Sequence, residues 1–151
     1  MPVLYSCHPR SKKMLDERGF DLDPRVVQHE PLGFHDYNCL QMNAFAVVSD
    51  SGTLPEESSY FTSIGRPFPA VCIRTSTKRP EALDKGCFIL SGIDTVGLLQ
   101  AVDTAVQMVN DEPSGGAVPV PDYMDTNVSN KVVKIIQSYG GVVNKMVWRK
   151  Y

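Results

Sequence analysis

The stretch Ser51-Gly52-Thr53 and the carboxylate of Glu57 have the residue types and spacing of a site for a phosphorylated ligand. The apolar run 45–48 leads into them, which predicts a strand, a tight turn and a helix start near Leu54. Backbone N–H groups at a helix N-terminus are unpaired and carry the positive end of the helix dipole, so they hold a diphosphate without a lysine. Ser51 adds a hydroxyl donor, Gly52 permits close approach, and Glu57 is placed to accept hydrogen bonds from a ribose diol.

The composition of the chain excludes several classes of protein. Its 151 residues fit one domain, and 42% hydrophobic residues suffice for a core of ordinary size. A formal net charge of −2 leaves no basic field for nucleic acid or anionic lipid. The apolar runs are far short of a membrane span, and the N-terminus lacks the features of a signal peptide. We therefore expect a globular cytoplasmic protein that binds neither nucleic acid nor membrane.

The cysteines and histidines predict no metal site. The four cysteines lie far apart without a Cys-x-x-Cys pair, so neither zinc nor a redox motif is indicated. We interpret them as buried thiols, because most lie in or beside apolar segments. His29 and His35 lack metal-ligand spacing, and we interpret them as a structural residue and a surface residue. The sequence thus predicts neither a metal nor another cofactor.

Strands and helices alternate along the chain, which predicts an α/β fold. The expected strands are short apolar runs bounded by Gly, Pro or charged residues, and we interpret them as buried on both faces. Such alternation implies right-handed crossovers, a Rossmann-like parallel sheet with helices on both faces, and ligands beyond the carboxyl ends of the strands. The expected strands are residues 2–6, 26–29, 45–49, 70–74 and 87–91, and the expected helices are residues 10–18, 36–43, 54–62 and 95–109.

A stretch rich in Pro and Gly divides the chain into a Rossmann-like ligand-binding domain, residues 1–121, and a helical tail, residues 122–151. Within the tail, Asn127 and its neighbours are expected to cap a helix that Gly140-Gly141 ends. The apolar face of the tail, which includes Trp148, needs a partner surface outside this chain. Because the chain opens directly into a strand, we expect a piece of a longer protein that lacks its first strand–helix unit.

Four motifs, in this order, resemble those of the UDP-N-acetylglucosamine 2-epimerase family, specifically the C-terminal nucleotide-binding half of its two-domain, glycosyltransferase-B-like fold. The resemblance covers nearly the whole chain, and the combination of motifs is specific although no single motif is. The tail further resembles the branch that forms UDP-N-acetyl-L-fucosamine for capsule or O-antigen. The motifs are Val3-Leu4-Tyr5-Ser6-Cys7-His8-Pro9-Arg10, Pro31-Leu32-Gly33-Phe34-His35-Asp36-Tyr37, Ser49-Asp50-Ser51-Gly52-Thr53-Leu54-Pro55-Glu56-Glu57 and Arg74-Thr75-Ser76-Thr77-Lys78-Arg79-Pro80-Glu81-Ala82.

The resemblance implies a role for individual residues at a UDP-sugar. It puts His8 near the diphosphate, and the backbone amide of Leu32 and the ring of Tyr37 at the uracil. The other implied roles are phosphate contacts for Ser51, Gly52 and Thr53, a ribose contact for Glu57, and substrate binding by the cation of Arg79.

The resemblance also implies a reaction: loss of UDP by elimination, a 2,3-unsaturated sugar intermediate, and re-addition with inverted configuration at C2. It needs no nicotinamide. The family's acid and base carboxylates lie upstream of the point where this chain begins, so no catalytic residue is expected here and an N-terminal half is required. The family's habit of dimerising implies a homodimer. Two other functions stay open: a nucleotide-sugar glycosyltransferase or hydrolysing epimerase with the same phosphate site, and a UDP-binding module without catalysis.

Several of these residues also have a simpler structural interpretation. A lone histidine such as His8 is more often a hydrogen-bonded structural residue, and Tyr37 suits packing in a core. Glu56 and Glu57 would each complement a helix dipole, a contribution of about 0.3–1 kcal/mol at exposed positions. The simpler interpretation of Arg79 is a solvent-exposed loop cation. For Lys78 this interpretation is the favoured one.

Overall fold

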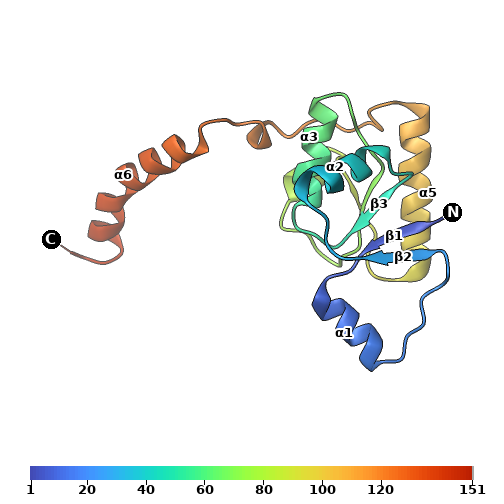
Figure 1. Cartoon of the computed structure of the whole chain (residues 1–151). Coiled ribbons are helices and arrows are strands. Elements are labelled where there is room, and N and C mark those ends of the chain that lie inside the picture. Colours follow the sequence, from blue (N-terminus) through green and yellow to red (C-terminus); the bar gives the residue numbers. More distant parts are fainter. Residues whose placement is uncertain (151) are drawn as a thin grey trace. The chain divides into compact units, whose positions relative to one another are not determined.

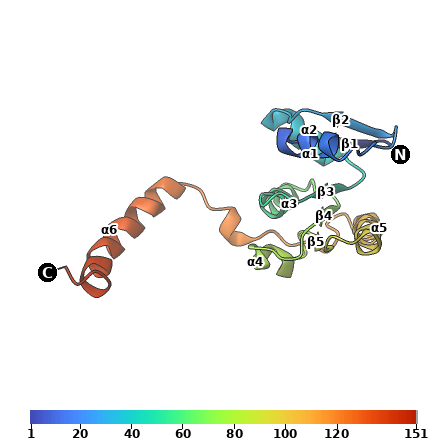
Figure 2. The ribbon, with the colours of Figure 1, turned by 90° about the horizontal axis from the view of Figure 1, so that it is seen from below.

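The structure is a computed structural model that describes residues 1–150 of the 151-residue chain. These residues form two compact units, residues 1–45 and the residues from Ala46 onward, which we name the N-terminal and the C-terminal unit. Figure 1 labels some of the helices and strands of both units, and Figure 2 labels further ones. The predicted division into residues 1–121 and 122–151 stays a prediction.

The N-terminal unit consists of β1 (Val3–Ser6), α1 (Pro9–Glu17), β2 (Val26–His29) and α2 (Phe34–Asn43). Its two strands pair in parallel, with Val3 opposite Val26 and Ser6 opposite His29. The sequence prediction of burial on both faces does not hold for this pair, because Leu4 and Val27 are each half exposed within this chain. The carboxyl ends of β1 and β2 lie at the same edge of the sheet, so the residues after them are neighbours there.

The C-terminal unit contains a three-stranded parallel sheet in the order β3-β4-β5. The apolar runs form strands at the predicted places, although each is shorter than expected. A short helix and a 3₁₀ turn, neither of which was predicted, follow β4 and α5. The elements are β3 (Val47–Ser49), α3 (Leu54–Ser63), β4 (Ala70–Cys72), α4 (Pro80–Asp84), β5 (Ile89–Leu90), α5 (Thr95–Asp111), η1 (Pro121–Tyr123) and α6 (Val128–Met146).

The central strand β4 is buried on both faces, and its alternation divides the core into two layers. Ala70 and Cys72 pack with Leu54 and Phe61 of α3 on one face. Val71, between them, packs with α5 on the other face. Figure 2 shows α3 and α5 on opposite sides of this sheet. The period-two side-chain alternation of a strand thus explains why helices cover both faces, and the predicted α/β class with a parallel sheet is confirmed.

Helix α5 packs against β4, with the partly buried Leu98 and Val102 beside Val71. Ala101 and Ala105 are buried in the same contact. The small side chains at these positions let the helix approach β4 closely. Asp94 caps the helix, because its carboxylate accepts a hydrogen bond of 2.8 Å from the Gly97 N–H.

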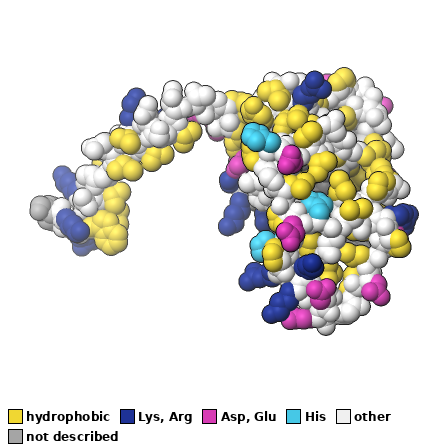
Figure 3. All heavy atoms as spheres, in the orientation of Figure 1, with side chains coloured by type: hydrophobic (Ala, Val, Ile, Leu, Met, Phe, Trp, Pro, Cys, Tyr) yellow, Lys and Arg dark blue, Asp and Glu magenta, His cyan; other side chains and the backbone are white. Residues whose placement is uncertain are grey.

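Helix α6 continues past the point where the sequence predicted its end. Gly140-Gly141 was expected to stop it, yet the helix runs on to Met146, and Val142 and Val143 continue its apolar stripe. Asn127 precedes the helix in the left-handed region, with φ of 57°, and its side chain makes no capping hydrogen bond. Figure 3 shows yellow hydrophobic side chains gathered along this helix. Among the helix's apolar residues, Val132, Ile136, Tyr139 and Val143 are exposed within this chain.

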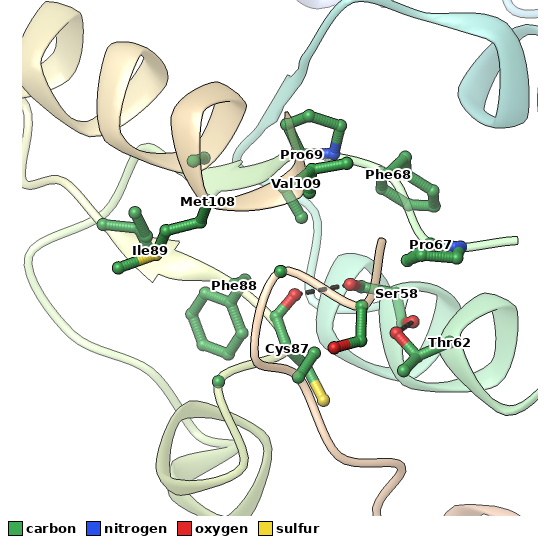
Figure 4. Close-up of a pocket in the computed structure, with 16 residues that line it drawn as sticks. Ser58, Thr62, Pro67, Phe68, Pro69, Cys87, Phe88, Ile89, Met108 and Val109 are labelled. Atoms are coloured by element: carbon green, nitrogen blue, oxygen red, sulfur yellow. Dashed lines mark hydrogen bonds between the residues drawn. The ribbon is translucent and has the colours of Figure 1, made fainter. Parts of the chain in front are cut away.

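A small apolar cavity of about 30 Å³ lies in the core of the C-terminal unit, beside Phe68, Phe88 and Met108 (Figure 4). The hydroxyl of Ser58 donates a hydrogen bond to the Cys87 carbonyl at its side. A space of this size holds no more than one or two water molecules, so it is too small for a ligand. Among the described residues, no helix has both the length and the apolar character needed to cross a bilayer.

Candidate diphosphate-binding site

A cavity of about 380 Å³ opens beyond the carboxyl ends of β3 and β4, where the C-terminal unit carries its predicted phosphate residues. Its volume falls within the range of small-molecule sites in proteins, about 300–1,000 Å³. Four residues predicted from the sequence line it, together with others that the sequence did not single out. The lining residues are Ser51, Gly52, Thr53, Pro55, Glu56, Cys72, Arg74, Thr77, Lys78 and Arg79.

A chain of hydrogen bonds joins Ser51, Thr53 and Glu57 at the start of α3. The Thr53 hydroxyl donates to Glu57 Oε1 at 2.8 Å, and the Ser51 and Thr53 hydroxyl oxygens are 2.9 Å apart. Because the single hydroxyl proton of Thr53 goes to Glu57, Ser51 is the donor in the second bond. The Ser51 oxygen in turn accepts from the Thr53 N–H at 3.2 Å. Glu57 itself does not line the cavity, but these hydrogen bonds connect its carboxylate to the two hydroxyls that do.

The backbone around Gly52 suits the approach of an anion. Among the described residues, the N–H groups of Gly52 and Leu54 donate no hydrogen bond, and a Cβ built on Gly52 meets no atom within 4 Å. Three features reduce the number of donors, and one of them is the bond from the Thr53 N–H to the Ser51 hydroxyl described above. Pro55 lacks an N–H, and the Ser51 N–H donates to the Ser49 hydroxyl at 3.0 Å. The site therefore depends on side-chain donors as well as on the helix start.

Arg79 reaches the cavity from the loop before α4 and forms an ion pair with Glu56. Its Nη2 lies 2.6 Å from Glu56 Oε1, and its Nε donates to the same oxygen at 2.7 Å. The hydrogen bond to Glu56 raises the pKa of the Arg79 guanidinium, which stays charged. Both side chains remain about two-fifths exposed, at 41% for Arg79 and 39% for Glu56. The cation is thus held in place without being sealed from a ligand.

Sequence reasoning missed Arg74 and gave Lys78 only the role of a solvent-exposed cation. Both line the same cavity as the phosphate loop, and among the described residues neither forms an ion pair. Two cations without carboxylate partners and a third in a partly exposed pair make this cavity attractive to an anion. The signal was present in the sequence, because Arg74 comes two residues after the end of β4, at the edge where ligands bind in such sheets.

The thiol of Cys72 also borders the cavity. Burial raises its pKa, and the nearby charge of Arg74 offsets this only in part. A buried thiol of raised pKa is a poor nucleophile at neutral pH, so the residue serves packing. Cys7 and Cys87 are buried as predicted, whereas Cys39 is exposed, which corrects the interpretation of all four cysteines as buried thiols. Among the described residues, no cluster of His, Cys, Asp or Glu could hold a metal ion.

The N-terminal unit carries the other predicted site residues. His8 directly precedes α1 and caps it, because its Nδ1 accepts a hydrogen bond of 3.2 Å from the Arg10 N–H. This is the structural role that the simpler interpretation foresaw, and it leaves the other ring nitrogen of His8 for a ligand. Leu32 lies in the loop between β2 and α2, and Tyr37 lies in the first half of α2. His8 and Leu32 thus follow the carboxyl ends of neighbouring strands.

A parallel sheet covered by helices on both faces defines a Rossmann-like architecture, and solved structures agree. The structure of UDP-N-acetylglucosamine 2-epimerase from Rickettsia bellii matches with a TM-score of 0.75 and 37% identity, covering 99% of this chain and 40% of that one. The Methanocaldococcus jannaschii enzyme in complex with UDP-GlcNAc and UDP matches with a TM-score of 0.71, over 91% of this chain and 36% of that one. The latter match is 24% identical and shows the fold alone.

The family model described as UDP-N-acetylglucosamine 2-epimerase matches residues 1–137. This chain therefore belongs to the UDP-N-acetylglucosamine 2-epimerase family, a family of isomerases, and the resemblance to that family is confirmed. The finer resemblance of the tail to the branch that forms UDP-N-acetyl-L-fucosamine stays a prediction. The 2-epimerase of Methanococcus maripaludis is 32% identical over 105 residues, which are 67% of this chain and 27% of that protein. The chain thus spans about a quarter of the length of such curated relatives.

Proposed function

We propose that this chain is the UDP-binding C-terminal portion of an epimerase that inverts C2 of a UDP-2-acetamido sugar. The observation that carries the proposal is the cavity of about 380 Å³ lined by Ser51, Gly52, Thr53 and Arg79. A diphosphate needs converging N–H and hydroxyl donors together with cations, and this cavity has both. A relative from M. jannaschii, 32% identical over 107 residues, is named UDP-N-acetylglucosamine 2-epimerase, which supports the same ligand class here.

The diphosphate lies in this proposal against the start of α3, with Ser51 and the Gly52 N–H as donors. Arg79 exchanges part of its pairing with Glu56 for phosphate oxygens, while Arg74 and Lys78 supply further positive charge. A partly exposed ion pair contributes only about 0–1 kcal/mol, so its replacement by a doubly charged group costs little. Phosphate binding therefore rests on the loop and on three cations together.

The nucleoside is assigned to residues that a diphosphate alone does not reach. The Glu57 carboxylate accepts hydrogen bonds from the ribose diol in addition to the one from the Thr53 hydroxyl, because a carboxylate has lone pairs for several donors. The Leu32 amide and the Tyr37 ring hold the uracil, which suits a neutral base that needs one stacking surface and a backbone hydrogen bond. His8 completes the set on the side of the diphosphate, through its second ring nitrogen.

The acid and base carboxylates come, in this proposal, from an N-terminal half of the intact protein, and the apolar face of α6 packs on that half. The face includes Val132, Ile136, Tyr139 and Val143, which are exposed within this chain. A reaction is accelerated by binding the transition state more tightly than the substrate. A portion of the enzyme that only binds UDP therefore lowers the dissociation constant for UDP without producing turnover. The purified 151-residue chain is therefore expected to bind UDP and to epimerise no UDP-sugar. A robust epimerase rate from this chain alone would contradict that division of labour.

The proposed contacts can be mapped by recording amide chemical shifts of the labelled chain during a titration with UDP. The largest shifts are expected at Ser51, Gly52, Thr53 and Arg79, with a second group at Leu32 and Tyr37. Uridine is the matched control, because it lacks the diphosphate and should move only the second group. Shifts from UDP that avoid residues 51–53 in a folded sample would overturn the proposed site.

A further inference from the structure

Tyr123 reaches from η1 back to α4, where its hydroxyl donates a hydrogen bond of 2.5 Å to Glu81 Oε1. The two residues are 42 positions apart in the sequence. Glu81 lies in the first turn of α4, two residues after Arg79, the cation of the candidate site. The bond thus joins the segment after α5 to the helix start from which Arg79 extends.

Helix α4 needs such an anchor because it has only five residues and its preceding residue, Arg79, provides no side-chain cap. A helix this short is not stable by itself in water, and its position is set by tertiary contacts. One contact is Ala82, which is fully buried in the core of the C-terminal unit. Another is the Tyr123 bond to Glu81, which lies in the turn nearest the cavity.

The Tyr123 segment is itself firmly attached to the core. Val120 is buried, and its N–H donates a hydrogen bond of 2.8 Å to the Ser59 hydroxyl on α3. The side chain of Tyr123 packs against the same core cluster. Residues 120–123 therefore contact both α3 and α4, the two helices whose N-terminal ends border the cavity.

We propose that Tyr123 is a positioning residue that, through Glu81, holds Arg79 in the orientation that meets the diphosphate. The inference rests on the proposed function for its ligand, but the link from Tyr123 to Arg79 exists in the free chain. Glu81 and Glu56 both act on Arg79, since each carboxylate raises the pKa of its guanidinium. Tyr123 holds the Glu81 carboxylate in the charged form by donating to it, which lowers the pKa of Glu81.

The variant Tyr123→Phe tests this link, because it removes the hydroxyl and leaves the packing of the ring. Tyr60→Phe is the matched control, since Tyr60 is a half-exposed residue of α3 that lies outside the cavity lining. In the free chain, the Arg79 Nε–Hε proton should exchange with solvent faster in Tyr123→Phe and at an unchanged rate in Tyr60→Phe. The loss of one such hydrogen bond should also weaken UDP binding by roughly threefold to tenfold.

A double-mutant cycle separates positioning from general loosening of the fold. In the Arg79→Ala background, Tyr123→Phe should have no further effect on UDP affinity, because the residue that it positions is gone. An equal loss in both backgrounds, or unchanged Arg79 exchange in a folded Tyr123→Phe chain, would overturn the inference. Glu81→Gln, which keeps an acceptor and removes the charge, gives the second variant if Tyr123→Phe does not fold. A wild-type chain that fails to bind UDP would overturn the proposed function. The exchange rate of the Arg79 Nε–Hε proton in the free chain would still test whether Tyr123 positions Arg79.

Discussion

Arg79 and Glu56 meet at the wall of the cavity, with 2.6 Å between Nη2 and Oε1, although 23 residues separate them in the sequence. The pair links the start of α3 to the loop before α4, so the two segments that would enclose a diphosphate are tied together. It leaves Glu57, the next residue of α3, to the hydroxyl of Thr53. The two adjacent glutamates therefore have different partners and, we expect, different functions.

Glu57→Ala should weaken UDP binding by about tenfold or more, since a charge-assisted hydrogen bond contributes about 1.5–3 kcal/mol. Glu56→Ala should have a smaller effect, because it removes a carboxylate that competes with the diphosphate for Arg79. Calorimetric titration of both variants with UDP checks this difference. Equal losses in the two variants would refute the assignment of the ribose contact to Glu57.

Arg74→Ala should weaken UDP binding and make it less sensitive to salt, because the guanidinium adds a charge that has no carboxylate partner among the described residues. We expect a loss of about threefold to tenfold at low salt, and a similar loss for Lys78→Ala. Arg66→Ala is the control, since Arg66 is an exposed loop cation of the same unit that does not line the cavity. Equal effects from Arg66 and Arg74 would mean that only net charge matters.

Ser59→Ala should destabilise the C-terminal unit by about 1–3 kcal/mol, because it leaves the buried N–H of Val120 without an acceptor. Ser63→Ala, at the exposed end of α3, removes a bond to the Tyr60 carbonyl that water can replace, so its effect should be much smaller. Urea unfolding of the two variants measures the difference. A Ser59→Ala chain as stable as the wild type would show that the linker after α5 is not fastened through this bond.

Thiol labelling should distinguish the exposed Cys39 from the three buried cysteines. Burial raises the pKa of Cys72 and of Cys87, so at a given pH less of the reactive thiolate is present at either residue. Iodoacetamide followed by mass spectrometry should modify Cys39 first, and the others only after unfolding. UDP should protect Cys72 further, because that thiol borders the cavity. Labelling of Cys72 as fast as that of Cys39 in the native chain would contradict its burial.

Local patterns in the sequence were enough to predict most of the fold. The short apolar runs form parallel strands, and Leu54 begins a helix directly after the phosphate loop, because such features depend on neighbouring residues. Helix α4 was missed since five residues carry almost no periodic signal, and its position depends on the distant Tyr123. The extent of α6 was underestimated because two glycines cost about 2 kcal/mol relative to alanine, yet the apolar residues beyond them continue the helix.

The sequence likewise predicted only those features of the candidate site that depend on neighbouring residues. The loop Ser51-Gly52-Thr53 and Arg79 were found from motifs, and they line one cavity. The pairing of Arg79 with Glu56 and the position of Arg74 at the cavity were not predicted. Both depend on how β3 and β4 bring the loops that follow them together. Side-chain partners across a sheet edge are set by the register of the strands, which composition and spacing do not report.

The most direct test of the central claim is a calorimetric titration of the purified chain with UDP, UMP and uridine. We expect saturable binding in which UDP is tightest, because only UDP presents the full diphosphate to the start of α3 and to the cations at the cavity. Uridine should bind weakly or not at all. A folded chain that fails to bind UDP, or binds it no tighter than uridine, would contradict the assignment of the cavity to a diphosphate.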